Sequence, residues 1–292
     1  MIQHDGAGNR CIQQRGKQAS GTNRTRQQIP PMASAPGSLW RDPADGREMV
    51  YVPPGRFVFG APPSVGRASW AAPLIAEQRV HLDGYWIDRA AVSNNAYRRF
   101  VEQTGYPEPR SWHEGLRGGD VMVSRELPWR EMGDLPVVVT WDEAMAYCRW
   151  ALKTLPSEEE WEKAARGTDG RRYPWGPQWP KELGTGWSKP QIDLASLDVS
   201  PLGCLGMFHS QEWTRSRGAD GSVVLKGYPV SPGPTWGAPF EPFVAALWFR
   251  DLGDTGTCAA FRCVLGPRPE TRSRTGTPRT RATSSGQDGK SL

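Results

Sequence analysis

Two capping boxes lie close together in the middle of the chain and fix the start of two short helices. Thr140 is followed three residues later by Glu143, and Ser157 by Glu160. In this pattern the hydroxyl and the carboxylate each accept a hydrogen bond from the backbone N–H of the other residue. An earlier helix is expected after Ser93, a good N-cap residue. The apolar residues at helical spacing behind these starts are Ala96, Tyr97, Phe100 and Val101, then Ala144, Tyr147, Cys148 and Trp150, then Trp161, Ala164 and Ala165.

Glycine and proline surround these helices. The 292 residues include 33 Gly, 27 Pro and 14 Trp, which favours a loop-rich domain held together by aromatic packing. Gly167 is expected to end the third helix as a left-handed C-cap. Few helices and many irregular connections predict an α+β fold with little regular secondary structure.

Short β-prone runs account for the remaining ordered segments. Residues 48–60 read as two strands around Pro53-Pro54-Gly55, and we expect them to form a hairpin. Residues 79–88 form a further stretch, broken at Asp83-Gly84. Three more strands are expected near the C-terminal end, at 222–227, 244–249 and 260–265.

The positive charge is concentrated at the two ends of the chain. Residues 1–40 carry five Lys/Arg against one acidic residue, and residues 267–292 carry six against two. The residues between them are net negative, although the whole chain is +5. We therefore expect a disordered leader at 1–40, one domain at 41–266 and a disordered basic tail at 267–292. Such ends can bind nucleic acid or anionic membranes. Without aromatic residues among the arginines, we favour solvated extensions and expect no nucleic acid or membrane partner.

The sequence contains no stretch that reads as a membrane span or a secretory signal. We expect a cytoplasmic protein, in which thiols mostly stay reduced. Its five cysteines are Cys11, Cys148, Cys204, Cys258 and Cys263, and none of them form a CxxC zinc pattern.

Several ordered motifs, taken in order, resemble the sulfatase-modifying-factor family of formylglycine-generating enzymes. The matching segments are 49–60 (MVYVPPGRFVFG), 80–88 (VHLDGYWID), 92–101 (VSNNAYRRFV), 137–150 (VVVTWDEAMAYCRW), 155–167 (LPSEEEWEKAARG), 173–176 (YPWG), 212–214 (EWT) and 261–263 (FRC). The resemblance implies a variant of the C-type-lectin fold. It also implies structural roles for Cys148, Cys263, Trp141, Trp161, Arg166, Trp175, Trp213 and Arg262.

The residues that carry the family's chemistry are missing from their expected place. The resemblance implies an oxygen-dependent oxidation of a sulfatase cysteine at copper, held by two cysteines four residues apart after a Lys/Arg-Gly-Gly-Ser strand. Here the strand reads LKGYPV at 225–230, and residues 231–240 contain no cysteine. Cys258 and Cys263 have the right spacing, and we keep them as weak catalytic candidates. By register, Cys263 instead matches a structural cysteine, which the resemblance places beside Cys148.

The family's calcium sites are also eroded. The resemblance implies one site in a loop that here reads GMFHSQEW at 206–213, where Glu212 is the one side-chain ligand retained. The other loop should contain an Asn after YPWG, but residues 177–191 have none. Because calcium takes six to eight oxygen ligands, we expect no bound calcium and no other cofactor, with copper as the alternative.

Other polar and aromatic residues have simpler interpretations. His113 and His209 could pair, but without supporting spacing we favour exposed loop histidines. The run Glu158 to Glu160 could serve acid–base chemistry, yet its place in a first helical turn favours capping and dipole compensation. Tryptophans in unmatched loops are candidates for a surface contact: Trp112, Trp129, Trp179, Trp187 and Trp236.

Two function classes follow from this pattern, and a gene product without function is a third reading. The favoured hypothesis is a pseudoenzyme: a non-catalytic module on this scaffold that binds a protein or peptide. The alternative is an oxygen-dependent oxidoreductase of the same family with a rearranged site. Fold alone does not decide between them.

Overall fold

The computed structural model describes most of the central part of the chain. The described residues are 30, 34–61, 75–113, 117–118, 121–122, 129–178, 197–208, 210–218, 220–227, 248–250 and 257–266. Within them, no helix combines the length and apolar character needed to cross a membrane.

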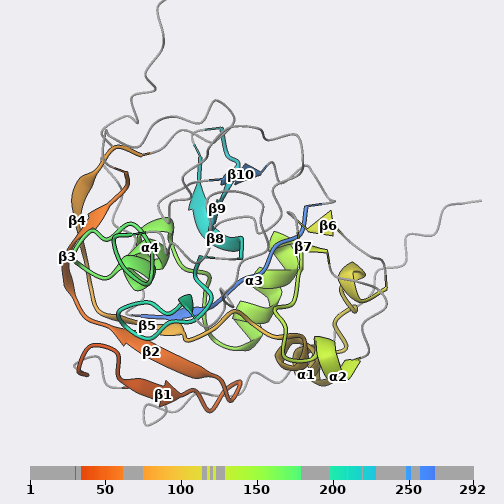
Figure 1. Cartoon of the computed structure of the whole chain (residues 1–292). Coiled ribbons are helices and arrows are strands. Elements are labelled where there is room, and N and C mark those ends of the chain that lie inside the picture. The colour runs from red at the N-terminus through yellow and green to blue at the C-terminus, as the bar shows by residue number, and fades with distance from the viewer. Residues whose placement is uncertain are drawn as a thin grey trace, which may run out of the picture.

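A four-stranded antiparallel sheet joins the beginning and the end of the described chain. Its order is β1 (Leu39–Arg41), β2 (Glu48–Val52), β5 (Tyr85–Asp88) and β11 (Val264–Leu265). In Figure 1 the orange β1 and β2 lie beside β5, and the blue C-terminal strand completes the sheet. The chain therefore closes on itself, with residues from both ends of the domain in one sheet.

The other strands form smaller sheets. The antiparallel order β10-β9-β8 joins Trp248–Arg250, Val223–Lys226 and Glu212–Arg217. Strands β3 (Gly55–Phe59) and β4 (Gln78–Leu82) pair with each other, and β6 (Arg117–Gly118) pairs with β7 (Val121–Met122).

Three main helices have the starts that the sequence predicts. Helix α1 spans Asn94–Thr104 behind Ser93, while α3 (Trp141–Trp150) and α4 (Glu158–Arg166) each begin with a complete capping box. A short α2 (Trp129–Met132) and a 3₁₀ turn, η2 (Arg110–Trp112), lie between α1 and α3. The prediction for Gly167 is half right. Its φ of 69° is positive, but its ψ of −142° is extended rather than left-handed helical. The left-handed cap is at Gly105, which ends α1.

Three buried clusters form the core of the described residues: two join helices to strands, and a smaller one consists of Met49, Tyr51 and Trp86 from the four-stranded sheet. The largest places the apolar faces of α1 and α3 against β8, β9 and the FRC segment, through Tyr97, Tyr147, Trp213 and Phe261. The second places α4, through Trp161, against the inner face of the four-stranded sheet. This mixed arrangement of short helices and short strands is the α+β fold that the sequence predicts.

Two predictions about the N-terminal part are wrong. Strands β2 and β3 exist on either side of Pro53-Pro54, but they do not form a hairpin. Strand β2 pairs with β1 and β5, whereas β3 pairs with β4. The two prolines lack backbone N–H donors, and the chain passes from one sheet into another there. The domain also begins earlier than residue 41, because Leu39–Arg41 is already paired as β1.

Several predictions lie outside the described residues. They are the leader up to residue 29, the basic tail at 267–292, the segment 231–240, His209 and the tryptophans at 179, 187 and 236. The expected strand at 244–249 is described only from residue 248, where β10 begins.

Candidate functional site

Cys148 and Cys263 lie against each other in the core. Their Sγ atoms are 3.2 Å apart as two reduced thiols, and both residues are fully buried. Cys148 faces inward from α3, and Cys263 precedes β11. Burial, and next the hydrogen bond with Cys148, raise the pKa of the Cys263 thiol well above its usual value. A thiol in this state is a poor nucleophile and a poor metal ligand.

The remaining described cysteines are also interior. Cys258 is 4% exposed, and its neighbour Ala259 forms a bridge with Val139. Cys204 is fully buried, and burial raises its pKa to about 11. The structure therefore pairs Cys263 with Cys148, the arrangement that the resemblance implies, rather than presenting Cys263 with Cys258 at a surface.

Beside Cys263 lies an ionic centre that the sequence analysis missed. Lys153 follows α3, where Leu152 takes a left-handed φ of 58° and the Lys153 N–H donates to the Cys148 carbonyl at 2.8 Å. This turn directs the Lys153 ammonium into the protein. Asp88 ends β5, and Asp42 and Asp45 come from the turn between β1 and β2.

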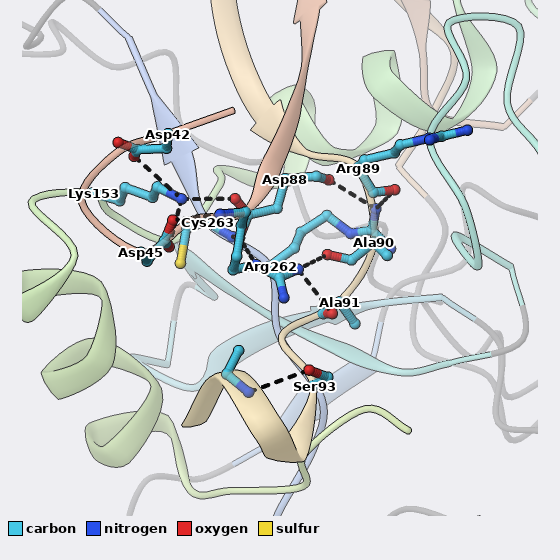
Figure 2. Close-up of polar contacts among 12 residues, drawn as sticks. Asp42, Asp45, Asp88, Arg89, Ala90, Ala91, Ser93, Lys153, Arg262 and Cys263 are labelled. Atoms are coloured by element: carbon cyan, nitrogen blue, oxygen red, sulfur yellow. Dashed lines mark hydrogen bonds and ion pairs between the residues drawn. The ribbon is translucent and has the colours of Figure 1, made fainter. Parts of the chain in front are cut away.

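Three carboxylates converge on the Lys153 ammonium. Its Nζ lies 2.7 Å from Asp45 Oδ2, 3.0 Å from Asp88 Oδ1 and 3.4 Å from Asp42 Oδ2, and all four side chains are fully buried. Figure 2 shows the carboxylates pointing toward this one nitrogen. Burial opposes its charge, but Asp88 and Asp45 raise the pKa of Lys153 overall. The ammonium thus occupies the place where a cation would bind these aspartates.

Asp88 connects this ionic centre to the cysteine pair. Its Oδ2 accepts the backbone N–H of Cys263 at 3.0 Å and pairs with Arg47 Nε at 3.3 Å. Burial works to raise the pKa of Asp88, but Lys153 and Arg47 more than offset it and lower that pKa. Asp45 behaves oppositely: burial, aided by the Asp88 charge, raises its pKa despite Lys153.

Glu212, the residue that the resemblance assigns to a calcium site, is paired with Arg262. The guanidinium donates to both carboxylate oxygens, from Nε to Oε2 at 2.6 Å and from Nη2 to Oε1 at 2.7 Å. Trp161 Nε1 also donates to Oε2 at 2.8 Å. All three side chains are fully buried. A calcium ion at Glu212 would have to displace this guanidinium, so the residues present fit the ion poorly.

A third buried network surrounds Arg166. Arg166 Nη1 donates to Glu162 Oε1 at 2.6 Å and to the Gly60 carbonyl at 2.8 Å. Lys226 Nζ pairs with the other oxygen of Glu162 at 2.8 Å. This network ties α4 to the end of β3 and to β9, immediately before the segment 228–247, which lies outside the described residues.

The aromatic candidates divide between the core and its edge. Trp161 and Trp213 are fully buried, and Trp213 Nε1 donates to the Val139 carbonyl at 2.8 Å. Trp141 and Trp175 are partly buried at the edges of the two clusters. Trp112, expected at a surface contact, instead packs edge-on against Tyr97 and donates to Asn94 Oδ1 at 2.7 Å.

The acidic run and the described histidine behave as the simpler interpretations predict. Glu160 closes the capping box of α4 and pairs with Arg215. Glu158 is buried at the same helix start, and Ser216 Oγ accepts its backbone N–H at 2.9 Å. His113 is exposed and lies 2.8 Å from Glu108.

An arginine-lined cavity of about 390 Å³ lies on the other side of Arg47 from the ionic centre. It is lined by Arg41, Gly46, Arg47, Glu48, Arg89, Ala90, Ser93, Asn95, Ala96, Arg99, Asp134 and Leu205. The sequence analysis missed this cavity, because its residues come from segments far apart in the chain. The available signal in the sequence was Asp88-Arg89, two charged residues of which the first ends the otherwise apolar β5 and the second follows it.

No group of three or more His, Cys, Asp or Glu residues is placed to hold a metal ion within the part of the chain that the structure describes. What the described residues do contain is buried ion pairs and an open cavity. Nucleophilic chemistry by the described cysteines would first require their exposure.

Comparison with known proteins agrees with the motifs. Formylglycine-generating enzyme from Bos taurus is 33% identical over 177 residues, which is 49% of this chain and 46% of that protein. Inactive C-alpha-formylglycine-generating enzyme 2 from the same species is 33% identical over 171 residues, 47% of this chain and 56% of that protein. The chain thus spans about half the length of these curated relatives.

Solved structures extend the agreement to the fold. PvdO from Pseudomonas aeruginosa aligns with a TM-score of 0.55 and 19% identity, covering 80% of this chain and 99% of that one. The family described as sulfatase-modifying factor enzyme 1-like domain matches residues 36–216. That match covers more than half of the sequence and begins three residues before β1. The chain therefore belongs to the sulfatase-modifying factor enzyme 1-like domain family.

Proposed function

We propose that this chain is a non-catalytic member of its family, without formylglycine-generating oxidase activity, and that it binds a protein or peptide. The observation that carries the proposal is the position of the thiols. Cys148 and Cys263 are buried against each other, and Cys204 and Cys258 are also interior. Thiolates bind Cu(I) well, but thiols buried in the core must first reach solvent before they can bind the ion.

The pattern of cysteines along the sequence supports the same proposal. Residues 231–240, where the resemblance places the copper pair, contain no cysteine. Cys263, the second residue of the one C-x4-C spacing, is instead next to Cys148. A relative whose name marks it as inactive, at 33% identity, supports the existence of non-catalytic members.

The second candidate is an oxygen-dependent oxidoreductase with a rearranged site. The 33% identity to a formylglycine-generating enzyme favours it, because the shared scaffold would need only a new set of reactive residues. Those residues would differ from the buried cysteines described above, since none of these presents a thiolate to solvent.

Cu(I) binding and peptide turnover together distinguish the two candidates. The full chain is titrated with Cu(I) against a colorimetric chelator, then incubated aerobically with a Cys-x-Pro-x-Arg peptide and followed by mass spectrometry. A peptide with Ser in place of Cys is the substrate control. We expect no stoichiometric Cu(I) binding and no conversion of the cysteine.

Matched variants locate any activity that is found. Cys258→Ala removes one member of the C-x4-C spacing, while Cys204→Ala removes a buried thiol outside it. Turnover that Cys258→Ala abolishes and Cys204→Ala retains would overturn the proposal in favour of the oxidase. The expected location of the protein, the cytoplasm, stays a prediction that fluorescence microscopy of a tagged chain can check.

A further inference from the structure

The arginine-lined cavity brings together three segments that are far apart in the sequence. Arg41 comes from β1, Arg89 from the residue after β5, and Arg99 from the second turn of α1. Ala90, Ala96 and Leu205 add apolar surface between them. The first turn of α1 also has no acidic residue, so the positive end of that helix is not neutralised from within the helix.

In and beneath the cavity, the positive and the negative side chains lie at different depths. The five cations and five carboxylates in and beneath the cavity balance in number. However, the aspartates beneath it are fully buried, while the side chains of Arg41 and Arg89 are 69% and 37% exposed. Arg99 is exposed as well. An approaching ligand therefore meets the arginines before it meets the aspartates.

Two of the exposed arginines, Arg41 and Arg89, share the carboxylate of Glu48. Glu48 takes Arg41 Nη2 at 3.2 Å on one oxygen and Arg89 Nη1 at 3.0 Å on the other. Its side chain is 39% exposed. Because solvent-exposed ion pairs contribute little to stability, a ligand carboxylate can take the place of Glu48 at small cost. Arg99 Nη2 donates a hydrogen bond to the Asp45 carbonyl at 2.8 Å, which fixes the direction of the guanidinium.

We propose that Arg41, Arg89 and Arg99 form a binding site for an acidic peptide segment of a partner protein. Guanidinium groups match carboxylates in a two-pronged geometry, and three of them from three elements exceed what one carboxylate can engage. The ligand therefore carries at least two carboxylates, with aliphatic stems that contact Ala90, Ala96 and Leu205. This inference names the partner class for the binding function proposed above and uses none of the cysteines.

Fluorescence anisotropy with a labelled tetraglutamate peptide tests the site on the full chain. The comparison peptide is tetraglutamine, and inorganic phosphate is the competitor. We expect tetraglutamate to bind, tetraglutamine not to bind, and affinity to fall as salt is raised. Arg41→Gln, Arg89→Gln and Arg99→Gln should each weaken binding by about three- to tenfold. Arg98→Gln, on the same helix but outside the cavity, should leave it unchanged.

Three results would overturn the proposal. The first is that a variant combining Arg41→Gln, Arg89→Gln and Arg99→Gln retains full affinity for tetraglutamate, in which case the basic chain ends bind the peptide. The second is that Arg98→Gln weakens binding as much as Arg99→Gln, which would indicate a general electrostatic attraction and no defined site. The third is that inorganic phosphate binds as tightly as the peptide, which would identify a site for small anions. None of these results bears on Cu(I) binding or turnover, so failure here is distinguishable from failure of the proposed function.

Discussion

The ionic centre around Lys153 and the arginine rim of the cavity (Arg41, Arg89 and Arg99) lie on either side of Arg47. They differ in the burial of their charged groups and in the partners of those groups. Inside, one ammonium has three carboxylates within 3.4 Å, all fully buried. At the rim, Arg41 and Arg89 share the carboxylate of Glu48, which is 39% exposed, and the exposed Arg99 donates to the Asp45 backbone carbonyl. Buried charges are held in place by their partners, whereas exposed charges can exchange partners. We therefore assign the inner set to folding and the rim to binding.

Removing the buried cation should have the largest effect. Lys153→Met leaves three carboxylates in the interior without their shared partner, and we expect a loss of about 3–5 kcal/mol in unfolding free energy. Equilibrium unfolding in urea at pH 7 measures it. Arg98→Gln, an exposed change, should stay within about 0.5 kcal/mol. A Lys153→Met loss below about 1 kcal/mol would contradict the assignment of this centre to folding.

Glu212 tests whether the second buried ion pair behaves like the first. Glu212→Gln removes the charge that Arg262 needs but keeps one acceptor, so we expect a loss of about 2–3 kcal/mol. The double variant Glu212→Leu/Arg262→Met should recover part of this loss, since no buried charge is left alone. Thermal and urea unfolding report both. If the double variant loses more stability than Glu212→Leu and Arg262→Met lose in sum as single variants, the pair is not a self-contained unit.

Asp88 and Asp45 should change the stability of the protein in opposite directions as the pH is lowered, because their pKa values shift in opposite directions. Because the pKa of Asp88 is lowered in the folded state, its stabilising contribution is present above the pKa of the unfolded chain. That contribution is lost as pH falls through the folded value. Asp45, with a raised pKa, acts in the opposite direction. We expect Asp88→Asn to flatten the loss of stability between about pH 4 and 2, measured by urea unfolding across pH.

Helix capping should give a smaller, local effect. Ser157→Ala removes the acceptor for the Glu160 N–H, a bond of 3.1 Å, and we expect a loss of about 1 kcal/mol. Chemical denaturation at neutral pH is sufficient to detect it. Thr140→Ala at the start of α3 should cost a similar amount. No loss in either variant would show that tertiary contacts alone hold these helix starts.

Rim substitutions should have the smallest effect on stability. Arg41→Gln and Arg89→Gln each break an exposed ion pair with Glu48, so we expect changes of about 0–1 kcal/mol in unfolding free energy. The same variants should weaken tetraglutamate binding. A rim variant that unfolds the protein as severely as Lys153→Met would remove the contrast between the two regions.

The sequence predicts local features well because local chemistry determines them. The N-cap at Ser93 and the capping boxes at Thr140 and Ser157 depend on residues within one turn, and the structure confirms all three. Strand pairing depends on distant segments, which explains why 48–60 was wrongly expected to be a hairpin. Pro53-Pro54 marks a real turn, but it does not say which strands pair beyond it.

The ionic centre and the cavity were beyond prediction for the same reason. Asp42, Asp88 and Lys153 lie in three separate segments, and each reads alone as an ordinary charged residue. The pairing of β1, β2 and β5 and the bridge between Thr154 and Val264 bring them together beside Cys263. The pairing of Cys148 with Cys263 could be predicted from the family resemblance. The ion pair between Glu212 and Arg262 could be seen only in the structure.

Thiol accessibility in the native chain tests the central claim most directly. A Cys11→Ser variant removes the cysteine outside the described residues, and an aromatic disulfide reagent then counts the thiols that react before unfolding. We predict that none of Cys148, Cys204, Cys258 and Cys263 reacts on the timescale of minutes in buffer. In denaturant with reductant removed, they should become reactive. Two thiols that react rapidly in the native state would contradict the account, because they would show a cysteine pair open to copper.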